Sequence, residues 1–413
     1  MTLLAVPLTL LYGEIDFAGY YQNWTALRLR QDPDFMLLRN RLRLDTQIRQ
    51  ESLRGFVSLD LRNDMESGET DFEITLREAY IDLYFERTDL RIGKQQVVWG
   101  KADGLFINDI VCPLDMRWFL LQDFDNIRTG LTMIRADVYL GDWTFEGLWI
   151  PEFEPWKFAA QGSDWEFGFA LPDTIFFGPE VVNIFHLAEP QPPESSLENS
   201  EVGVKVSTFM WGADLAFLVL DGFNDHPAAE LDSIVVSNGS RIDSYLTPRY
   251  RRSRMYGLNF SRTAGPALVR GEMGYYTDRR FPSPADISFS SVSDYFQGMV
   301  GLDFTGPFKV AISVQGIRQQ ILDHTPDMIE DEIHDLATVV VRGSFWRETA
   351  TAFLLGIFDP AEKGGLARIL FDYSWVDGLS LSVGTDLLWG DETSIFGQFD
   401  PNDNLFFKVR YYF

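Results

Sequence analysis

The chain has 413 residues and a net charge of -26, from 61 acidic and 35 basic residues, and this charge argues against a nucleic-acid partner. Its single cysteine, Cys112, excludes an intramolecular disulfide, a thiolate zinc cage, an iron–sulfur cluster and covalently attached haem. Hydrophobic residues make up 46% of the chain, yet no apolar run reaches the length of about 18 residues that a membrane-spanning helix needs. Apolar and polar residues are therefore interleaved, and we expect no metal and no cofactor.

Residues 1–12 are apolar but lack a basic leading region, so we interpret them as a signal-peptide remnant or a periplasmic lead-in. We find no linker after them, and we predict a single domain over residues 13–413. The first clear pattern in this range surrounds RLRLDTQIRQ, where polar and apolar residues alternate with a period of two. Because alternate side chains of a strand point to opposite faces, we expect a polar face and an apolar face: Arg39, Arg41, Arg43, Asp45 and Gln47 against Leu42, Leu44, Thr46 and Ile48.

The same alternation returns along the whole chain, with hardly any helical periodicity. It is clear in RGFVSLDLR, REAYIDLYF, ARILFDYSW and LSLSVGTDL, each of which has one apolar and one polar face. The last ten residues, NLFFKVRYYF, alternate in the same way and end on Phe413. This pattern predicts an all-β protein, and for the final stretch alone the last strand of a soluble sandwich is the alternative.

The connections between these strands fall into two classes that alternate along the chain. We expect tight links at Glu51–Arg54, Arg87–Asp89, Gly141–Asp142, Trp211–Ala213, Ala264–Pro266, Gly306–Phe308, Glu348–Ala350 and Asp377–Gly378. Longer polar segments are expected at 31–35, 64–71, 100–128, 151–200, 222–248, 278–293, 320–335, 359–366 and 390–403. A sandwich has no reason to separate its connections, whereas an outer-membrane barrel has short periplasmic turns and long extracellular loops. We predict a closed, antiparallel transmembrane β-barrel of about 18 strands, or about 16 if a weak strand near 249–261 merges with a neighbour.

A barrel of this kind would lie in the outer membrane of a Gram-negative bacterium, in contact with outer-membrane lipids and lipopolysaccharide. Aromatic residues near the expected strand ends fit the interfacial girdles of such barrels: Tyr20, Tyr21, Trp143, Trp149, Trp211, Tyr275, Tyr276, Trp346, Trp375 and Trp389. The C-terminal Phe413, with Tyr411 two residues before it, looks like the signal by which the outer-membrane assembly machinery recognises its clients.

The stretch 76–155 resembles a large family of proteobacterial outer-membrane barrels. The resemblance is carried by GKQQVVWG (Gly93–Gly100), IVCPLD (Ile110–Asp115) and WIPEFEP (Trp149–Pro155). The first motif is also similar to the strand before the constriction loop of alginate-type exporters and related porins. The resemblance implies transport of a hydrophobic or extended cargo, and genes for such barrels often accompany RND-type lipid exporters and outer-membrane lipoprotein-sorting proteins. Relatives usually have Asn where this chain has Cys112, which leaves the role of this position open.

The segment 100–128 is the leading functional element. It mixes charged residues with large apolar side chains, so it would be poorly solvated outside a barrel, and we expect it to fold into the lumen and narrow it. The alternative is a rigid extracellular cap. The residues expected to form the constriction are Lys101, Asp103, Asn108, Asp109, Asp115, Arg117, Trp118, Asp123 and Asp125.

Six arginines on three adjacent predicted strands are expected to form one basic wall of the lumen, because neighbouring strands lie about 4.8 Å apart: Arg28, Arg30, Arg39, Arg41, Arg43 and Arg62. Acidic residues of the segment 100–128 on the opposite side would create a transverse field that favours polar or zwitterionic solutes. The alternative is that the arginines are salt-bridged to Glu14, Asp16, Asp45 and Asp60 and only stiffen the wall.

We predict a channel or transporter that passes a solute or a hydrophobic cargo, by passive passage or gated export. A hydrolase is disfavoured, and we expect no catalysis, because all four histidines lie in predicted loops: His186, His226, His324 and His334. The remaining alternative is a sheath or scaffold for a periplasmic or lipoprotein partner, such as a lipoprotein plug or an electron-transfer cytochrome.

Overall fold

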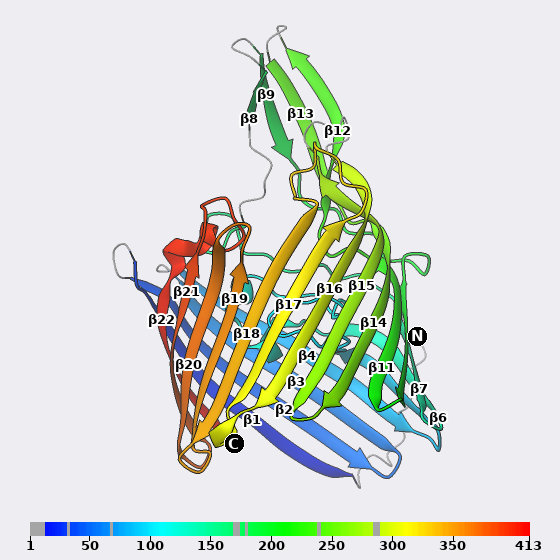
Figure 1. Ribbon diagram of the computed structural model, residues 1–413, viewed down its shortest axis with the longest axis vertical. Helices are drawn as coiled ribbons and strands as arrows, with labels where there is room; N and C mark the ends of the chain where they lie inside the picture. The colour runs from blue at the N-terminus through cyan, green and yellow to red at the C-terminus, as the bar shows by residue number, and fades with distance from the viewer. Residues whose placement is uncertain are drawn as a thin grey trace, which may run out of the picture.

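Figure 1 shows the computed structural model, which describes residues 13–30, 34–66, 69–167, 174–177, 181–237, 241–283 and 290–413. An antiparallel sheet of 18 strands closes on itself, because its first strand pairs with both the second and the last. The predicted closed barrel is therefore confirmed, with 18 strands and not 16. The interpretation of residues 1–12 concerns a segment outside the described residues.

The barrel strands are β1 (Glu14–Arg28), β2 (Phe35–Gln50), β3 (Leu53–Glu66), β4 (Glu69–Tyr84), β5 (Thr88–Gln95), β6 (Leu131–Leu140), β7 (Trp143–Ile150), β10 (Glu201–Met210), β11 (Ala213–Phe223), β14 (Arg252–Ala264), β15 (Ala267–Pro282), β16 (Ser290–Thr305), β17 (Ala311–Ile321), β18 (Ile333–Phe345), β19 (Ala350–Asp359), β20 (Gly364–Val376), β21 (Leu379–Trp389) and β22 (Asn404–Tyr412). The helical turns are η2 (Phe119–Leu121), α1 (Phe124–Ile127), η3 (Pro307–Lys309) and η4 (Gly397–Asn402). In the part of the chain that the structure describes, no helix is long and apolar enough to cross a membrane.

The tight links connect consecutive barrel strands, as predicted. Four of them contain a glycine with positive φ, a conformation that residues with a Cβ rarely adopt: Gly141 (62°), Gly212 (72°), Gly265 (62°) and Gly378 (79°). The tight links gather at one end of the barrel and the longer connections at the other (Figure 1). The two ends of the barrel are therefore built differently, which is typical of outer-membrane barrels.

The barrel closes through the last residue of the chain. Beyond the register of β1 with β22, Gly19 N donates to Phe413 O over 3.0 Å, and Phe413 N donates to Gly19 O over 3.1 Å. A Cβ at Gly19 would lie 2.2 Å from the carbonyl oxygen of Arg43 and 2.9 Å from the ring of Phe413. Only glycine permits this close approach.

Side chains alternate between the two surfaces of the wall. Large apolar side chains such as Phe17, Val204 and Val300 point outward and are 75%, 51% and 60% exposed. Polar side chains such as Gln22 and Asn259 point inward and are each 1% exposed. An apolar outer surface around a polar interior is the arrangement expected of a barrel that contacts lipid.

Exposed aromatic side chains lie in or beside four of the tight links. Trp211, Phe308 and Trp346 are 79%, 87% and 70% exposed, and Trp375 is 64% exposed. Phe308, Trp211 and Trp346 have positive φ angles of 61°, 57° and 49° within their turns. Rings at this level are suited to the interface between lipid and water.

Two long connections, β7 to β10 and β11 to β14, build a second sheet that the sequence pattern did not predict. Its strands are β8 (Thr174–Phe177), β9 (Val181–Leu187), β12 (Ala228–Ser237) and β13 (Arg241–Arg249). β9 and β13 pair in parallel, and the other two pairs are antiparallel. This external sheet projects beyond the barrel end that carries the longer connections (Figure 1).

Candidate functional site

Residues 100–128, called the interior segment below, lie inside the barrel. Their first anchor is the carboxylate of Glu272 on β15, which is fully buried. It accepts hydrogen bonds from three backbone N–H groups, those of Lys101 (2.7 Å), Ala102 (2.9 Å) and Asn108. A carboxylate that accepts several backbone N–H groups forms strong hydrogen bonds and leaves no buried charge unsatisfied.

The second anchor of the interior segment is on β20 and β22. Lys408 Nζ and Arg410 Nη2 donate to the two carboxylate oxygens of Asp123, over 2.7 Å and 3.0 Å. Arg368 donates to the carbonyl oxygen of Leu121. Because β15 and β22 are seven strands apart in a barrel of 18, the interior segment crosses the lumen from one wall to nearly the opposite one.

The apolar side chains of the interior segment pack within the lumen. Trp118 and Phe119 are 5% and 3% exposed. The ring centroid of Phe119 lies 4.9 Å from that of Phe399, and that of Trp118 lies 6.1 Å from that of Trp165. Side chains from β16 to β22, from β1 and from the first residues of β2 complete this apolar cluster. A cap above the barrel would not make these contacts.

The described carboxylates of the interior segment each have a basic partner: Asp103 pairs with Arg270, Asp109 with Arg128, Asp115 with Arg117, and Asp123 with Lys408. Burial alone would raise the pKa of Asp115, but hydrogen bonds from Arg117 hold it below its ordinary value. Lys101 Nζ donates to Ser261 on β14, and the side chain of Asp125 lies outside the described residues. The predicted transverse field is corrected, because each of these acidic charges is neutralised by an adjacent cation.

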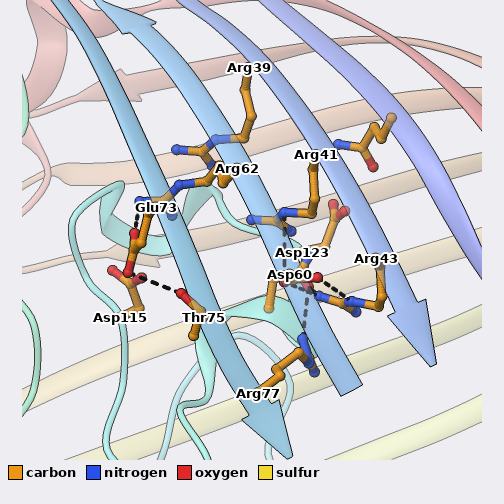
Figure 2. Close-up of polar contacts among 12 residues, drawn as sticks. Arg39, Arg41, Arg43, Asp60, Arg62, Glu73, Thr75, Arg77, Asp115 and Asp123 are labelled. Atoms are coloured by element: carbon orange, nitrogen blue, oxygen red, sulfur yellow. Dashed lines mark hydrogen bonds and ion pairs between the residues drawn. The ribbon is translucent and has the colours of Figure 1, made fainter. Parts of the chain in front are cut away.

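Lumen-facing residues of β2 and β3 stand directly opposite one another: Arg39 with Asp64, Arg41 with Arg62, and Arg43 with Asp60. Figure 2 shows the last two of these pairs. Arg39 donates two hydrogen bonds of 2.7 Å to Asp64. Arg43 donates two of 2.7 Å and 2.6 Å to Asp60. The alternative that the arginines are salt-bridged therefore named Asp60 correctly. It did not name Asp64 and Glu73, which also pair with arginines of the wall.

Arg28 and Arg30 do not join this wall. Arg28 is the last residue of β1 and lies four residues beyond Trp24, whose partner on β2 is Arg39. At about 3.3 Å per residue this places Arg28 about 13 Å nearer the rim. There it pairs with Asp34 and Asp164, and Arg30 pairs with Asp400 and Asp403. The prediction for these two arginines was wrong. It considered only that their strands are adjacent, and it ignored how far along the strand each residue lies.

Sequence reasoning missed Arg77 on β4. Strict alternation would place Arg77 on the outer face with Ala79 and Ile81. A β-bulge shifts the register of β3 and β4 at this point, so two successive residues turn inward. Arg77 Nη1 donates to Asn126 Oδ1 of the interior segment over 3.0 Å. The only signal in the sequence is the pair of adjacent charged residues, Arg77 and Glu78, which interrupts the alternation.

A small polar cavity of about 50 Å³, called the arginine cavity below, lies between the β2–β4 wall and the interior segment. Its lining contains six cationic and three anionic side chains, an excess of three positive charges: Arg41, Arg62, Arg77, Arg117, Arg128 and Lys157, against Asp60, Glu73 and Asp115. Thr75, Gln122 and Asn126 add neutral polar groups. The cavity therefore combines two predicted wall arginines with groups from β4 and from two long connections.

Cys112 is buried within the interior segment and has a structural position there. Its Sγ lies 3.2 Å from the backbone nitrogen of Val97, which donates to it. Burial raises the pKa of the Cys112 thiol to about 12, so the thiol stays protonated at neutral pH and is unreactive.

A closed antiparallel barrel with an apolar exterior, a polar lining and a connection folded across its lumen has the architecture of the porins. Among solved structures, OccK5 (OpdH) from Pseudomonas aeruginosa is similar over 97% of this chain and 98% of its own, with a TM-score of 0.53 and 10% sequence identity. OmpF of Salmonella typhi, in a complex with daunomycin, aligns over 97% and 98% with a TM-score of 0.47 and 9% identity. At such low identity the likeness concerns the fold alone.

No curated protein matches the chain. The chain belongs to the family described as "Protein of unknown function (DUF1302)", whose model matches residues 14–411.

Proposed function

We propose that this protein is a channel in the outer membrane of a Gram-negative bacterium and that it passes a polar solute along the inner face of β2–β4. The placement of the interior segment carries this proposal. The segment is anchored on β15 and β22. Its apolar side chains pack in one cluster against β16–β22, β1 and the first residues of β2, and in a second cluster against β6, β7, β11 and β14–β17. The polar arginine cavity is left on the remaining side, against β2–β4.

A second cavity on the same three strands supports this path. It is lined by Gln47, Arg49, Gln50, Leu53, Arg54 and Tyr84, at the tight-link end of β2, β3 and β4. The arginine cavity lies farther from that end, around Arg41 and Arg62. Both polar cavities therefore lie along the inner face of β2–β4, and together they mark the path that we propose for the solute.

The polar lining favours a polar solute over the hydrophobic cargo that the family resemblance implies. Nearly all side chains of the arginine cavity carry charges or hydrogen-bonding groups. An apolar molecule would displace water from these groups without replacing its hydrogen bonds, which costs free energy. The apolar cluster is filled by the rings of the chain itself. A link to RND-type exporters stays a prediction of the resemblance.

We also propose that the protein catalyses no reaction. No histidine is among the described residues that line the arginine cavity. His186 stacks on Tyr245 in the external sheet with ring centroids 4.7 Å apart, and His334 donates to or accepts from Asp359 over 2.5 Å. The alternative of a sheath for a partner is disfavoured because residues of the chain itself occupy the lumen.

Conductance in planar lipid bilayers tests the channel. We expect the parent protein to form small, steady channels, and we expect replacement of residues 102–125 by a short glycine–serine linker to enlarge them several-fold. As a control, replacing residues 233–244, in the β12–β13 hairpin of the external sheet, should leave conductance unchanged. Equal conductance of the parent and the 102–125 variant would contradict a constriction by the interior segment, and absence of conductance from both would contradict the channel itself.

A further inference from the structure

Arg41 and Arg62 stand directly opposite each other on β2 and β3 (Figure 2). Like charges at opposite positions destabilise a sheet. The charge of Arg62 is compensated by ion pairs with Asp64 (3.1 Å) and Glu73 (2.5 Å). The ion pair of Arg41, with Asp60, is 3.9 Å long, so Arg41 is the less compensated of the two.

Arg41 is also buried with an unsatisfied donor. Its side chain is 6% exposed, and among the described residues its Nε has no hydrogen-bond partner. The oxygen of its ion-pair partner, Asp60 Oδ2, lies 3.9 Å from Nε, which is too far for a hydrogen bond, and the Asp60 carboxylate accepts from Nε and Nη2 of Arg43 at 2.7 Å and 2.6 Å. A buried charged donor without an acceptor costs free energy, and an acceptor in the arginine cavity would remove that cost.

The other carboxylates of the arginine cavity are equally engaged. Glu73 accepts from Arg62 and from Arg117, at 2.5 Å and 3.2 Å. Asp115 accepts from Arg117 at 2.9 Å and 2.6 Å. Arg128 is neutralised by Asp109, and the other five cations of the lining outnumber its three carboxylates by two, although the chain as a whole carries a net charge of -26. A local excess of the opposite sign attracts anions into the cavity.

We propose that the arginine cavity binds an oxyanion, namely a carboxylate or phosphate group of the solute, with Arg41 as its principal donor. The inference rests on the proposed channel function and names the class of solute. A guanidinium presents two parallel N–H groups to a carboxylate or phosphate, which makes arginine the preferred partner of these groups. Arg62 and Arg77 add positive charge beside Arg41, and Lys157 adds it from another connection.

Calorimetric titration of the purified protein in detergent tests the site, with succinate and inorganic phosphate as separate probes. We expect saturable binding of at least one of them, and the one that binds identifies the group recognised. Arg41→Gln should weaken binding about tenfold or more, which is the loss expected for a charge-assisted hydrogen bond. Arg41→Lys should weaken it less, because the charge remains while the paired N–H groups are lost.

A matched control and a stability measurement exclude a purely structural role for Arg41. Arg318→Gln removes one positive charge from an exposed pair with Asp335 and should leave binding unchanged. Because Arg41→Gln removes the repulsion from Arg62, its melting temperature without anion should equal or exceed that of the parent. A lower melting temperature, unchanged binding by Arg41→Gln, or no binding of either probe to the parent would overturn the proposal.

Bilayer recordings separate failure of this site from failure of the channel. If the channel conducts but the probes neither bind nor alter its current, the oxyanion site is wrong and the channel stands. If the probes bind with the expected dependence on Arg41 but no conductance is seen, the site stands and the channel is wrong.

Discussion

At the scale of single residues, the barrel interior pairs its charges locally. Lys408 with Asp123 and Arg39 with Asp64 are examples in which two charged side chains satisfy each other. Glu272 differs, because the three hydrogen bonds described for its carboxylate come from backbone N–H groups of the interior segment. Its role is therefore to hold a length of chain in place, whereas the ion pairs neutralise side chains.

Glu272→Gln should lower the free energy of unfolding by about 2 kcal/mol, because the new amide NH₂ would meet N–H donors and leave them unsatisfied. Urea denaturation of the detergent-solubilised barrel, followed by tryptophan fluorescence, measures this change. The control is Glu348→Gln, which alters an exposed residue paired with Lys309 at 3.4 Å in a tight link. A surface pair contributes less than about 1 kcal/mol, so equal losses in the two variants would count against the anchoring role of Glu272.

At the scale of elements, much of the fold could be predicted from the sequence because each strand has one face toward lipid and one toward the polar interior. That constraint imposes the two-residue period seen around Arg41 and in the last strand. The number of strands could be counted because tight links and long connections alternate between them. The same rule misplaces Arg77, since a bulge is decided by pairing with β3 and not by the pattern of β4. The external sheet was not predicted because β9 and β13 belong to different connections, and their pairing leaves no local pattern in the sequence.

The external sheet should respond to acid through Asp243 on β13. Hydrogen bonds from Arg241 and with His186 of β9 lower the pKa of Asp243 from 3.8 to about 2. A depressed pKa means that the stabilisation is complete above the unfolded value and is lost as the pH falls from about 4 to about 2. Amide protection factors in β9 and β13 should therefore fall over this range while those in β2 do not. In Asp243→Asn the fall should be absent, and its persistence there would assign the acid response to another group.

At the scale of the whole molecule, stability depends on closing the sheet, because an open barrel would expose two unpaired strand edges. Closure joins Gly19 near the start of the described chain to Phe413 at its end, through hydrogen bonds of 3.0 Å and 3.1 Å. These bonds use backbone atoms only. The ring of Phe413 points outward and is 54% exposed. The sequence therefore predicted the closing strand, while the requirement for glycine opposite it follows only from the register.

The backbone of Phe413 closes the barrel, whereas its ring is expected to act in assembly, and a substitution can distinguish these two roles. Since the closing hydrogen bonds do not involve the ring, Phe413→Ala should leave the melting temperature of assembled barrels close to that of the parent. If the ring is what the outer-membrane assembly machinery recognises, the same variant should reduce, several-fold, the amount of heat-modifiable barrel recovered from outer membranes. Phe407→Ala is the matched control, because Phe407 lies on the same strand and the same face and is 45% exposed. An equal reduction in both variants would attribute the effect to lost lipid-facing apolar surface and would remove Phe413 as a recognition signal.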